Sequence, residues 1–491
     1  MNPSHSDTLL LNLPNAFVVT RRYMCSYNSP MSLFPPYELI SLGAIVREWK
    51  NRPVQLLDAI AEGLDRRAVL DRIARIQPAL IVTIAGFECF GEDMQEIEAI
   101  KRAFPNIPLV LFGHYPTVFP LEVMQNTSVD FILLGEPDLN FSELFDVIAG
   151  LQDPESVSGL AYRANGEIRI RNDQKRITAI DDLPLPAFEL LPHDKYSEPG
   201  MPRPFGMIQS ARGCPYACNF CVRSYGRRLT TKSPRQVVDE IRLLIDRHKI
   251  RSLRFIDDTF SANRERAIRI CKEMVAAKID LQWACLTRTD AVDAELLGEM
   301  KAAGCRRIYF GVESGSQRIL DRYNKRIKKN EALAALLLCR EVGLETSGFF
   351  MMGLPFETEE DFEETIEFAR NARLTYAMVV PLTLYPGTEL FDHHKEHVRF
   401  SLFPYVNTFR DKDLAKRWSD WERRFYRAFY FSPGYLARNV GALARSPLAM
   451  ARFALDTFRF AVMGRQDASN PFANLGAPPV ANEIVDESGR G

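Results

Sequence analysis

Short apolar runs alternate with amphipathic segments over residues 8–150. Each run is bounded by polar or turn-forming residues, which is typical of buried strands in a parallel sheet. The apolar runs are TLLLNL (8–13), VQLLDA (54–59), ALIVTIA (79–85), IPLVLF (107–112) and VDFILLG (129–135). The segments with helical spacing between them include 36–49, 65–76 and 91–104. We therefore predict a doubly wound, Rossmann-like α/β domain over 8–150, with its ligand site beyond the carboxyl ends of the strands.

The pattern changes over residues 151–200. The stretch SGLAYRANGEIRIR (158–171) has two strand-like pieces around Asn165-Gly166, a dipeptide that favours a tight hairpin turn. The following DDLPLPAFELLP (181–192) is rich in proline. We expect a hairpin and a linker that crosses to a second domain.

A second series of strand-like runs occupies residues 201–400. Its six members are FGMIQS (205–210), RSLRFIDD (251–258), LQWACLTR (281–288), RRIYFGVE (306–313), TSGFFMMG (346–353) and YAMVVPLT (376–383). Helical segments separate them, so the pattern predicts a partial (β/α)6 barrel similar to a TIM barrel. In such barrels the chemistry is carried by loops at the carboxyl ends of the strands.

Residues 401–466 are predicted to be helical, and residues 467–491 to form a disordered tail. Arg438, Arg445, Arg452 and Arg459 recur every seven residues and would share one helix face, while Pro447 divides the region into two helices. Three roles stay open for the arginine face. The first role is a solvated face of a packing appendage, the second is a cap that holds acidic substrate groups, and the third is a peripheral contact with anionic lipid.

Composition narrows the class of protein. The 491 residues are 46% hydrophobic and 25% charged, and the formal net charge of −1 does not indicate nucleic-acid binding. We find no signal peptide and no apolar run long enough to span a membrane. Six of the nine cysteines are scattered along the chain, which argues against a disulfide framework and favours a reducing cytoplasm.

The other three cysteines, Cys214, Cys218 and Cys221, lie in one loop directly after the first predicted barrel strand. A catalytic cysteine needs only one thiol and a base. A structural zinc site needs four ligands, and the closest histidines, His193 and His248, form no convincing pair with the loop. Three buried thiols without function are a further alternative. Three thiolates suit best a [4Fe–4S] cluster with one iron left open for a small molecule.

The loop CPYACNFC resembles the CxxxCxφC signature of the radical S-adenosylmethionine (SAM) enzymes, with Phe220 as the aromatic residue φ. The resemblance implies that the open iron binds the amino and carboxylate groups of SAM. One electron then cleaves SAM and releases a 5′-deoxyadenosyl radical that abstracts hydrogen from the substrate. It also implies that a low-potential flavodoxin or ferredoxin supplies the electron.

Further strand ends resemble the SAM-binding segments of this family. Asp257 or Asp258, after the second barrel strand, would accept from the SAM ammonium group. Arg288 and Glu313 end the third and fourth strands, where they would reach the SAM carboxylate or ribose. The segment around Gly353 after the fifth strand resembles the adenine-side motif, and YPGTEL (385–390) follows the sixth.

The layout over residues 8–400 resembles the cobalamin-binding subgroup of radical SAM enzymes. In the stretch DAIAEG, Asp58 and Gly63 match the DxHxxG motif of many cobalamin domains, but Ile60 replaces the histidine, so cobalt would have no lower histidine ligand. Two further segments complete the resemblance. Gly113 and His114 resemble the subgroup's glycine-histidine loop with one glycine fewer, and Gly135 and Glu136 resemble its GEGE-like turn.

These observations lead to three functional hypotheses. The first is a cobalamin-dependent radical SAM C-methyltransferase that acts on an unactivated carbon of a small molecule. The second is an oxidative cyclase of the magnesium-protoporphyrin ester cyclase type, which the aromatic segment WERRFYRAFY (421–430) resembles. The third is a noncatalytic module that senses cobalamin or redox state. The sequence does not name the substrate.

Overall fold

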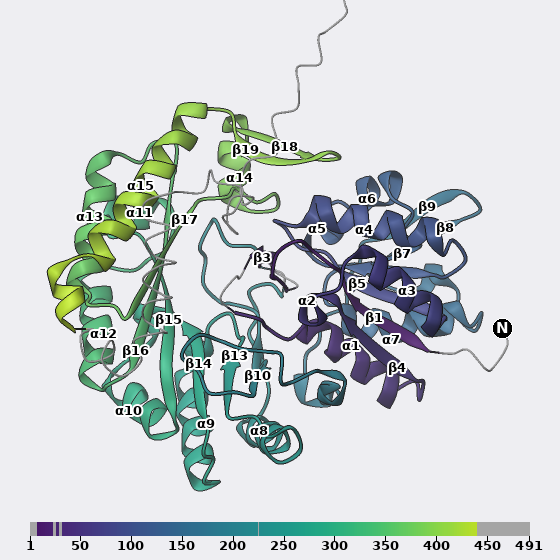
Figure 1. Cartoon of the computed structure of the whole chain (residues 1–491), viewed down its shortest axis with the longest axis horizontal. Helices are drawn as coiled ribbons and strands as arrows, with labels where there is room; N and C mark the ends of the chain where they lie inside the picture. Colours follow the sequence, from purple (N-terminus) through teal and green to yellow (C-terminus); the bar gives the residue numbers. More distant parts are fainter. Residues whose placement is uncertain (1–6, 23–25, 29–31, 224, 439–491) are drawn as a thin grey trace, which may run out of the picture.

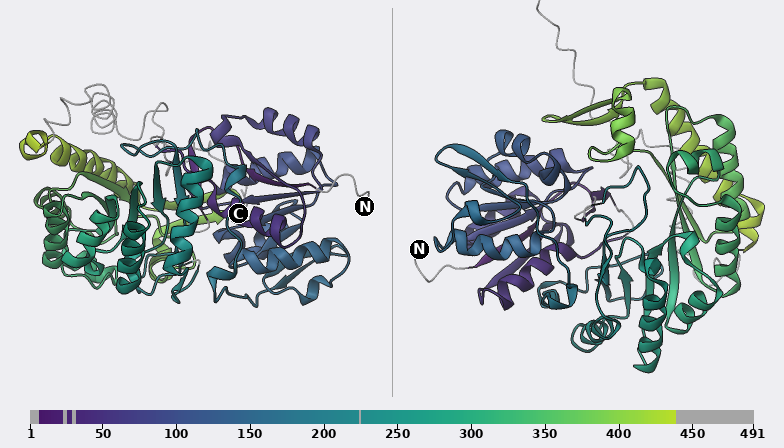
Figure 2. Two further views of the ribbon diagram at one scale, coloured as in Figure 1. Left: turned by 90° about the horizontal axis from the view of Figure 1, so that it is seen from below. Right: turned by 180° about the vertical axis from the view of Figure 1, so that it is seen from behind.

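The computed structural model describes residues 7–22, 26–28, 32–223 and 225–438. It contains two large sheets, which form separate lobes in each view (Figures 1 and 2). The first has the order β4-β1-β5-β6-β7-β8-β9, and its first five strands are parallel. Their bounds are β1 Thr8–Asn12, β4 Val54–Asp58, β5 Leu80–Ile84, β6 Leu109–Phe112 and β7 Phe131–Leu133. The predicted five-unit open sheet is therefore confirmed.

Helices cover both faces of this sheet, because its strands are apolar on both sides. Leu9 and Leu11 of β1 pack into one core with residues of α3 and α4, whereas Leu10 packs on the opposite face with α1 and α7. The helices of this lobe are α1 Tyr37–Glu48, α2 Ala59–Glu62, α3 Arg66–Ile76, α4 Phe90–Ala103, α5 His114–Val118, α6 Pro120–Asn126 and α7 Pro137–Ile148. A short hairpin, β2 Val19–Arg21 and β3 Ser26–Asn28, follows β1.

The hairpin predicted around Asn165-Gly166 is present, but it is not part of a separate linker. Its strands, β8 Leu160–Ala164 and β9 Glu167–Arg171, extend the first sheet, and β8 pairs antiparallel with β7. The addition covers the hydrogen-bonding edge that β7 would otherwise expose.

The second sheet has six parallel strands in chain order, which is the predicted partial barrel. The strands are β10 Phe205–Ile208, β13 Ser252–Phe255, β14 Gln282–Thr287, β15 Cys305–Glu313, β16 Glu345–Met352 and β17 Tyr376–Pro381. Helices lie on its outer side: α8 Pro234–His248, α9 Arg264–Ala276, α10 Ala294–Ala302, α11 Gln317–Arg322, α12 Lys329–Glu341 and α13 Glu359–Asn371 (Figure 1). A two-residue pair, β11 Ala211–Arg212 and β12 Thr230–Thr231, brackets the cysteine loop.

The chain after the barrel is not helical throughout, contrary to the prediction for 401–466. After α14 Glu389–His394, the strands β18 Val398–Leu402 and β19 Tyr405–Phe409 form an antiparallel hairpin. The long helix α15 Lys412–Tyr430 then packs along β17 and α13. Of the predicted arginine face only Arg438 is described, and Arg445, Arg452, Arg459 and the tail lie outside the described residues. Among the helices that the structure describes, none has the length and apolar character needed to cross a bilayer.

Candidate functional site

Asp257 fixes the chain where it enters the cysteine loop. Its buried carboxylate accepts hydrogen bonds from the Ser210 amide at 2.6 Å, the Ser210 hydroxyl at 2.5 Å and the Ala211 amide at 3.0 Å. These hydrogen bonds occupy both oxygens of the Asp257 carboxylate with groups of the protein itself. Asp257 therefore positions the loop, and of the predicted pair Asp258 remains the candidate for binding a cation.

Asp258 is half-buried next to the cysteines. Burial raises the pKa of its carboxyl to about 6, and the neighbouring charges of Asp257 and Glu38 add to this shift while Arg22 opposes it. The carboxylate also raises the pKa of Cys214 and Cys221, after the larger effect of burial. Asp258 thus places a negative charge where the loop opens toward the first lobe.

The three cysteines share a partly buried environment, and the sulfurs of Cys218 and Cys214 each have a polar side chain close by. Arg288 points its Nη1 at the Cys218 sulfur at 3.4 Å, and the Thr259 hydroxyl lies 3.7 Å from the Cys214 sulfur. Burial raises the pKa of Cys214, and the nearby Cys218 contributes to the shift. A bound metal cation would offset this cost by stabilising the thiolates.

Among the described residues, one group of three ligand-type side chains has its ligand atoms within 4.8 Å of one another, and it consists of His394, Glu396 and His397, outside the cysteine loop. The preference for an iron–sulfur cluster over zinc therefore depends on the number of thiols. Three cysteines are one ligand fewer than a structural zinc site needs, and they suit a [4Fe–4S] cluster with one open iron.

Arg288 is held rigidly beside the cysteine loop. Its Nε and Nη2 each contact the Asp290 carboxylate at 2.8 Å, and Nη2 also donates to the Lys325 carbonyl at 2.7 Å. Its guanidinium group lies 3.9 Å from the centre of the Tyr216 ring. The structure thus places the predicted Arg288 directly at Cys218, with its orientation already fixed.

Glu313 ends β15 in an unusual conformation. Its φ of 69° lies in the left-handed region, which non-glycine residues adopt at a cost, and the register with β16 shifts at this point. The carboxylate accepts from Lys325 Nζ at 2.7 Å, and Lys325 Nζ in turn lies 5.9 Å from the centre of the Phe220 ring. Lys325, which the sequence analysis missed, therefore connects two predicted site residues.

Three buried polar atoms around the loop have no hydrogen-bond partner among the described residues. They are Asn219 Oδ1, Thr289 Oγ1 and Tyr323 Oη. Asn219 lies within the loop, Thr289 follows Arg288, and the Tyr323 ring packs against Phe220 with centroids 5.1 Å apart. Unpaired buried polar groups are uncommon and call for a partner such as a water, an ion or a bound molecule. The donor set therefore fits a cluster together with a polar ligand such as SAM.

Gly353 lies where the C-terminal helix approaches the barrel. Its φ is 110°, and a side chain at this position would overlap the Trp418 indole of α15. The Gly353 and Leu354 amides donate to the buried Glu357 carboxylate at 2.5 and 3.2 Å, and burial raises the pKa of Glu357 to about 7. Trp418 was not predicted as a neighbour of Gly353, because the sequence motif around Gly353 does not indicate that α15, about 60 residues later in the chain, packs against it.

Asp58 and Gly63 form the ends of the short helix α2. Asp58 accepts from the Ala61 amide at 3.1 Å, from Asn12 Nδ2 at 2.7 Å and from the Tyr196 hydroxyl at 2.8 Å, while Gly63 ends α2 with a φ of 66°. The Asp58 carboxylate is thus occupied without a histidine partner. Ile60 between them is half-buried.

The loops after β5 and β6 contact the end of the second sheet. Gly113 has a φ of 134°, and any side chain there would overlap the Ala85 carbonyl. His114 Nε2 lies 3.3 Å from the Pro386 carbonyl, and the Phe87 ring stacks on Tyr385 with centroids 4.1 Å apart. The predicted glycine-histidine loop and the YPGTEL turn therefore form one interface between the lobes.

A second contact between the lobes joins the turn after β7 to the cysteine loop. Arg212, two residues before Cys214, donates to the Asp138 carboxylate at 2.6 Å and lies 3.5 Å from that of Glu136. The three side chains are at most 7% exposed. Gly135, with a φ of 71°, turns the chain so that Glu136 and the start of α7 face Arg212.

The environment of His114 predicts a pH-dependent stability. Burial lowers the pKa of His114 to about 4, although the hydrogen bond with the Pro386 carbonyl acts to raise it. The unfolded chain therefore binds more protons than the folded chain between pH 6.5 and 4. The contribution of His114 to the free energy of unfolding is therefore complete above pH 6.5 and is lost as the pH falls to 4. We expect this contribution to be on the order of 3 kcal/mol.

Urea unfolding of the cluster-free protein tests this prediction. His114→Gln should be less stable than the parent at pH 7, and the difference should shrink toward pH 4.5. The matched change His393→Gln, at an exposed histidine, should show no such trend. A difference for His114→Gln that is constant with pH would contradict the neutral, buried state of this ring.

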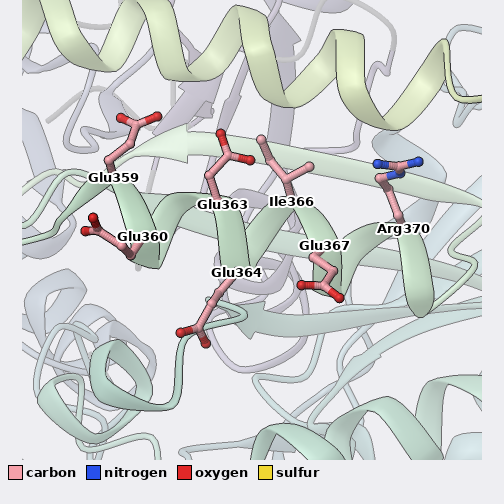
Figure 3. A pocket seen from close by; sticks show the side chains of 7 residues that line it. All are labelled: Glu359, Glu360, Glu363, Glu364, Ile366, Glu367 and Arg370. Atoms are coloured by element: carbon pink, nitrogen blue, oxygen red, sulfur yellow. The ribbon is translucent and has the colours of Figure 1, made fainter.

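A hollow on the outside of the barrel has a different character. Glu359, Glu360, Glu363, Glu364 and Glu367 project from α13 around it (Figure 3). Arg424 of α15 pairs with Glu359 at 2.5 Å, and Lys329 pairs with Glu364 at 2.6 Å. The hollow is therefore an acidic, solvated helix face with no connection to the cysteine loop.

Comparison with known proteins agrees with this geometry. The family model described as the Radical SAM superfamily matches residues 208–369, which run from the last residue of β10 into α13. The uncharacterized methyltransferase PH0819 of Pyrococcus horikoshii is 30% identical over 420 residues, which cover 83% of this chain and 90% of that protein. The chain belongs to the radical SAM superfamily and is a radical SAM enzyme.

Other relatives and solved structures extend the likeness to both lobes. The anaerobic magnesium-protoporphyrin IX monomethyl ester cyclase of Rubrivivax gelatinosus is 26% identical over 416 residues, which cover 82% of this chain and 75% of that protein. The methyltransferase TsrM from Kitasatospora setae, solved with cobalamin and a [4Fe–4S] cluster, has a TM-score of 0.64 at 20% identity over 80% of this chain and 78% of its own. OxsB with aqua-cobalamin has a TM-score of 0.68 at 17% identity, over 86% and 69% respectively. The predicted fold class is thereby confirmed.

Proposed function

We propose that this protein is a cobalamin-dependent radical SAM C-methyltransferase that acts on an unactivated carbon of a small molecule. The observation that carries the proposal is the way the two sheets meet. Loops after β5, β6 and β7 of the first sheet contact loops after β10 and β17 of the second, through Phe87–Tyr385, His114–Pro386 and Asp138–Arg212. Parallel sheets bind ligands at these carboxyl ends, so two ligand sites face each other.

On the barrel side, Cys214, Cys218 and Cys221 would hold three irons of a [4Fe–4S] cluster. When bound, the cluster and SAM together supply the 5′-deoxyadenosyl radical. Asp258 carries the charge that suits the SAM ammonium group, and Arg288, fixed beside Cys218, offers a cation at the position where a carboxylate would lie. The Glu313–Lys325 pair and Gly353 would border the nucleoside.

On the first lobe, the loops that begin at Asp58, Gly113 and Gly135 would hold cobalamin, which supplies the methyl group when it is bound. Ile60 occupies the position of the usual histidine, and His114 is buried against Pro386. We therefore propose that cobalamin, when bound, would lack the lower histidine ligand that the loop after β4 supplies in many cobalamin domains. A cobalt ion without a lower ligand would favour a low coordination number, and this in turn would favour release of the methyl group.

The cyclase activity is a second candidate, favoured by the 26% identity to the Rubrivivax gelatinosus enzyme. The segment WERRFYRAFY lies in α15, where Tyr426 and Tyr430 contact the backbone of β17. These tyrosines are thus part of the packing against the barrel. A cyclase reaction would add no carbon to its product, which separates it from methylation.

The test is a product-mass experiment with isotopically labelled SAM. The protein is reconstituted without oxygen with iron, sulfide and hydroxocobalamin. It is then supplied with methyl-deuterated SAM, a strong reductant and a small-molecule extract of the producing organism. We expect 5′-deoxyadenosine and a product that gains one labelled methyl group. A product that loses hydrogen without gaining label would support the cyclase, and a protein that cannot cleave SAM would leave only a sensing role.

A further inference from the structure

Three arginines lie in, or directly against, the segment that follows the cysteine loop. Arg227 and Arg228 follow Cys221 in the chain, and Arg176 comes from the segment after β9. All three are exposed. Arg176 lies directly against Gly226, since a side chain at Gly226 would overlap its guanidinium group. We call Arg176, Arg227 and Arg228 the basic rim.

The basic rim is attached to the first cysteine by the backbone. The Cys214 amide donates to the Gly226 carbonyl at 3.1 Å. Gly213 approaches the Arg228 carbonyl so closely that no side chain would fit there. A single hydrogen bond and one peptide unit therefore separate the exposed Arg227 from Cys214. The basic rim is therefore joined to the first cysteine by a short backbone path.

The charges of the basic rim are not neutralised within the described part of the chain. The ion pairs of that part include none with Arg176, Arg227 or Arg228. Three acidic residues that lie near the rim in the chain, or that pair with residues adjacent to it in the chain, form ion pairs with other cations. They are Asp173 with Arg171 at 3.1 Å, Glu143 with Lys175 at 2.5 Å and Asp138 with Arg212 at 2.6 Å. In a chain with a net charge of −1, this local excess of positive charge suits an acidic partner.

We infer that the basic rim is the docking surface for a small acidic one-electron carrier protein, such as a flavodoxin, that reduces the cluster. The inference rests on the proposed function, since it assumes a redox group at the cysteines. The step is a one-electron transfer in which the carrier is oxidised by one electron and the cluster is reduced by one, and no bond forms or breaks. The acidic face of α13 would repel the same carrier (Figure 3).

The test compares charge reversal at the rim with charge reversal elsewhere. The variant Arg227→Glu/Arg228→Glu changes two rim residues. The control Arg242→Glu/Arg247→Glu makes the same change in net charge at two exposed arginines of α8. Binding of each protein to flavodoxin is measured by surface plasmon resonance at several salt concentrations. SAM cleavage is measured with reduced flavodoxin and, separately, with Ti(III) citrate.

We expect the rim variant to bind flavodoxin at least tenfold more weakly than the parent, with a shallower salt dependence, and the control to change less than twofold. Flavodoxin-driven SAM cleavage should fall in parallel, while Ti(III)-driven cleavage should be unchanged. Equal weakening in both variants, or no weakening in the rim variant, would overturn the inference. Loss of Ti(III)-driven cleavage in the rim variant would overturn it too, because the arginines would then serve the substrate.

If the parent binds flavodoxin in the expected way but cleaves no SAM with either reductant, the proposed function fails and the docking surface stands.

Discussion

Cys218→Ala is expected to abolish formation of 5′-deoxyadenosine and to leave the reconstituted protein without its cluster. Cys218 is the most buried of the three loop thiols and the one that Arg288 contacts. The two remaining thiolates would not hold a [4Fe–4S] cluster that needs three cysteine ligands, so the loss of iron and of SAM cleavage should be complete rather than partial. Iron and sulfide content, together with SAM cleavage, provide the measurement.

The matched control is Cys271→Ala, which removes a fully buried thiol on α9, outside the loop. It should retain iron and activity. Cys218→Ala should also retain cobalamin, because the loops that begin at Asp58, Gly113 and Gly135 belong to the other lobe. Full iron content in Cys218→Ala would refute the cluster assignment. Loss of cobalamin in the same variant would mean that the two sites do not load independently.

Arg212→Met is expected to produce the largest loss of stability among single changes at the interface between the lobes. The substitution leaves Asp138 and Glu136 buried without their cation, and such uncompensated charges cost about 3–5 kcal/mol. The neighbouring carboxylates hold the pKa of Arg212 above its usual range although burial opposes this. We expect a corresponding fall in the free energy of unfolding in urea at pH 7.

Two further variants separate the ion pair from general effects of arginine loss. Arg235→Met on α8 removes a side chain that is 90% exposed and 3.8 Å from Asp239, and should cost less than about 1 kcal/mol. Arg212→Met/Asp138→Leu should recover part of the loss, because it removes one of the stranded charges along with the cation. A loss below about 1 kcal/mol in Arg212→Met would show that the contact does not join the lobes.

The strands of the first sheet could be predicted because most of their apolar runs are buried from both sides, and those of the second because short apolar runs alternate with helical segments. Leu9, Leu10 and Leu11 all lie in cores, so the sequence over β1 is apolar without a break. The β18–β19 hairpin was missed because its side chains are mostly half-buried and mixed in character, and its pairing partner is known only from the fold. The β8–β9 hairpin was predicted, but its attachment to β7 depends on contacts far apart in the chain.

Four of the cysteines that are scattered in the sequence come together in the barrel core. They are Cys271 on α9, Cys285 on β14, Cys305 on β15 and Cys339 on α12, and all are buried. Burial raises the pKa of Cys305, and its cysteine neighbours raise it further. They pack as small apolar side chains, which is the common fate of buried free cysteine.

The site could be predicted where a motif lies in one short segment. The three cysteines, Arg288 and Glu313 are all at strand ends of the barrel, as expected. Lys325 and Trp418 were missed because neither belongs to a motif, and only the fold brings them to Glu313 and Gly353. Asp257 or Asp258 was predicted to accept from the SAM ammonium group. The three hydrogen bonds of Asp257 to Ser210 and Ala211 favour Asp258 for this role, which stays a prediction.

Mössbauer spectroscopy of the protein reconstituted with ⁵⁷Fe, recorded before and after addition of SAM, tests the central claim most directly. The account predicts one [4Fe–4S] cluster per chain, in which a single iron changes its spectrum when SAM is added, because that iron has no cysteine ligand. Four iron sites that do not respond to SAM, or a metal content of zinc instead of iron, would contradict it.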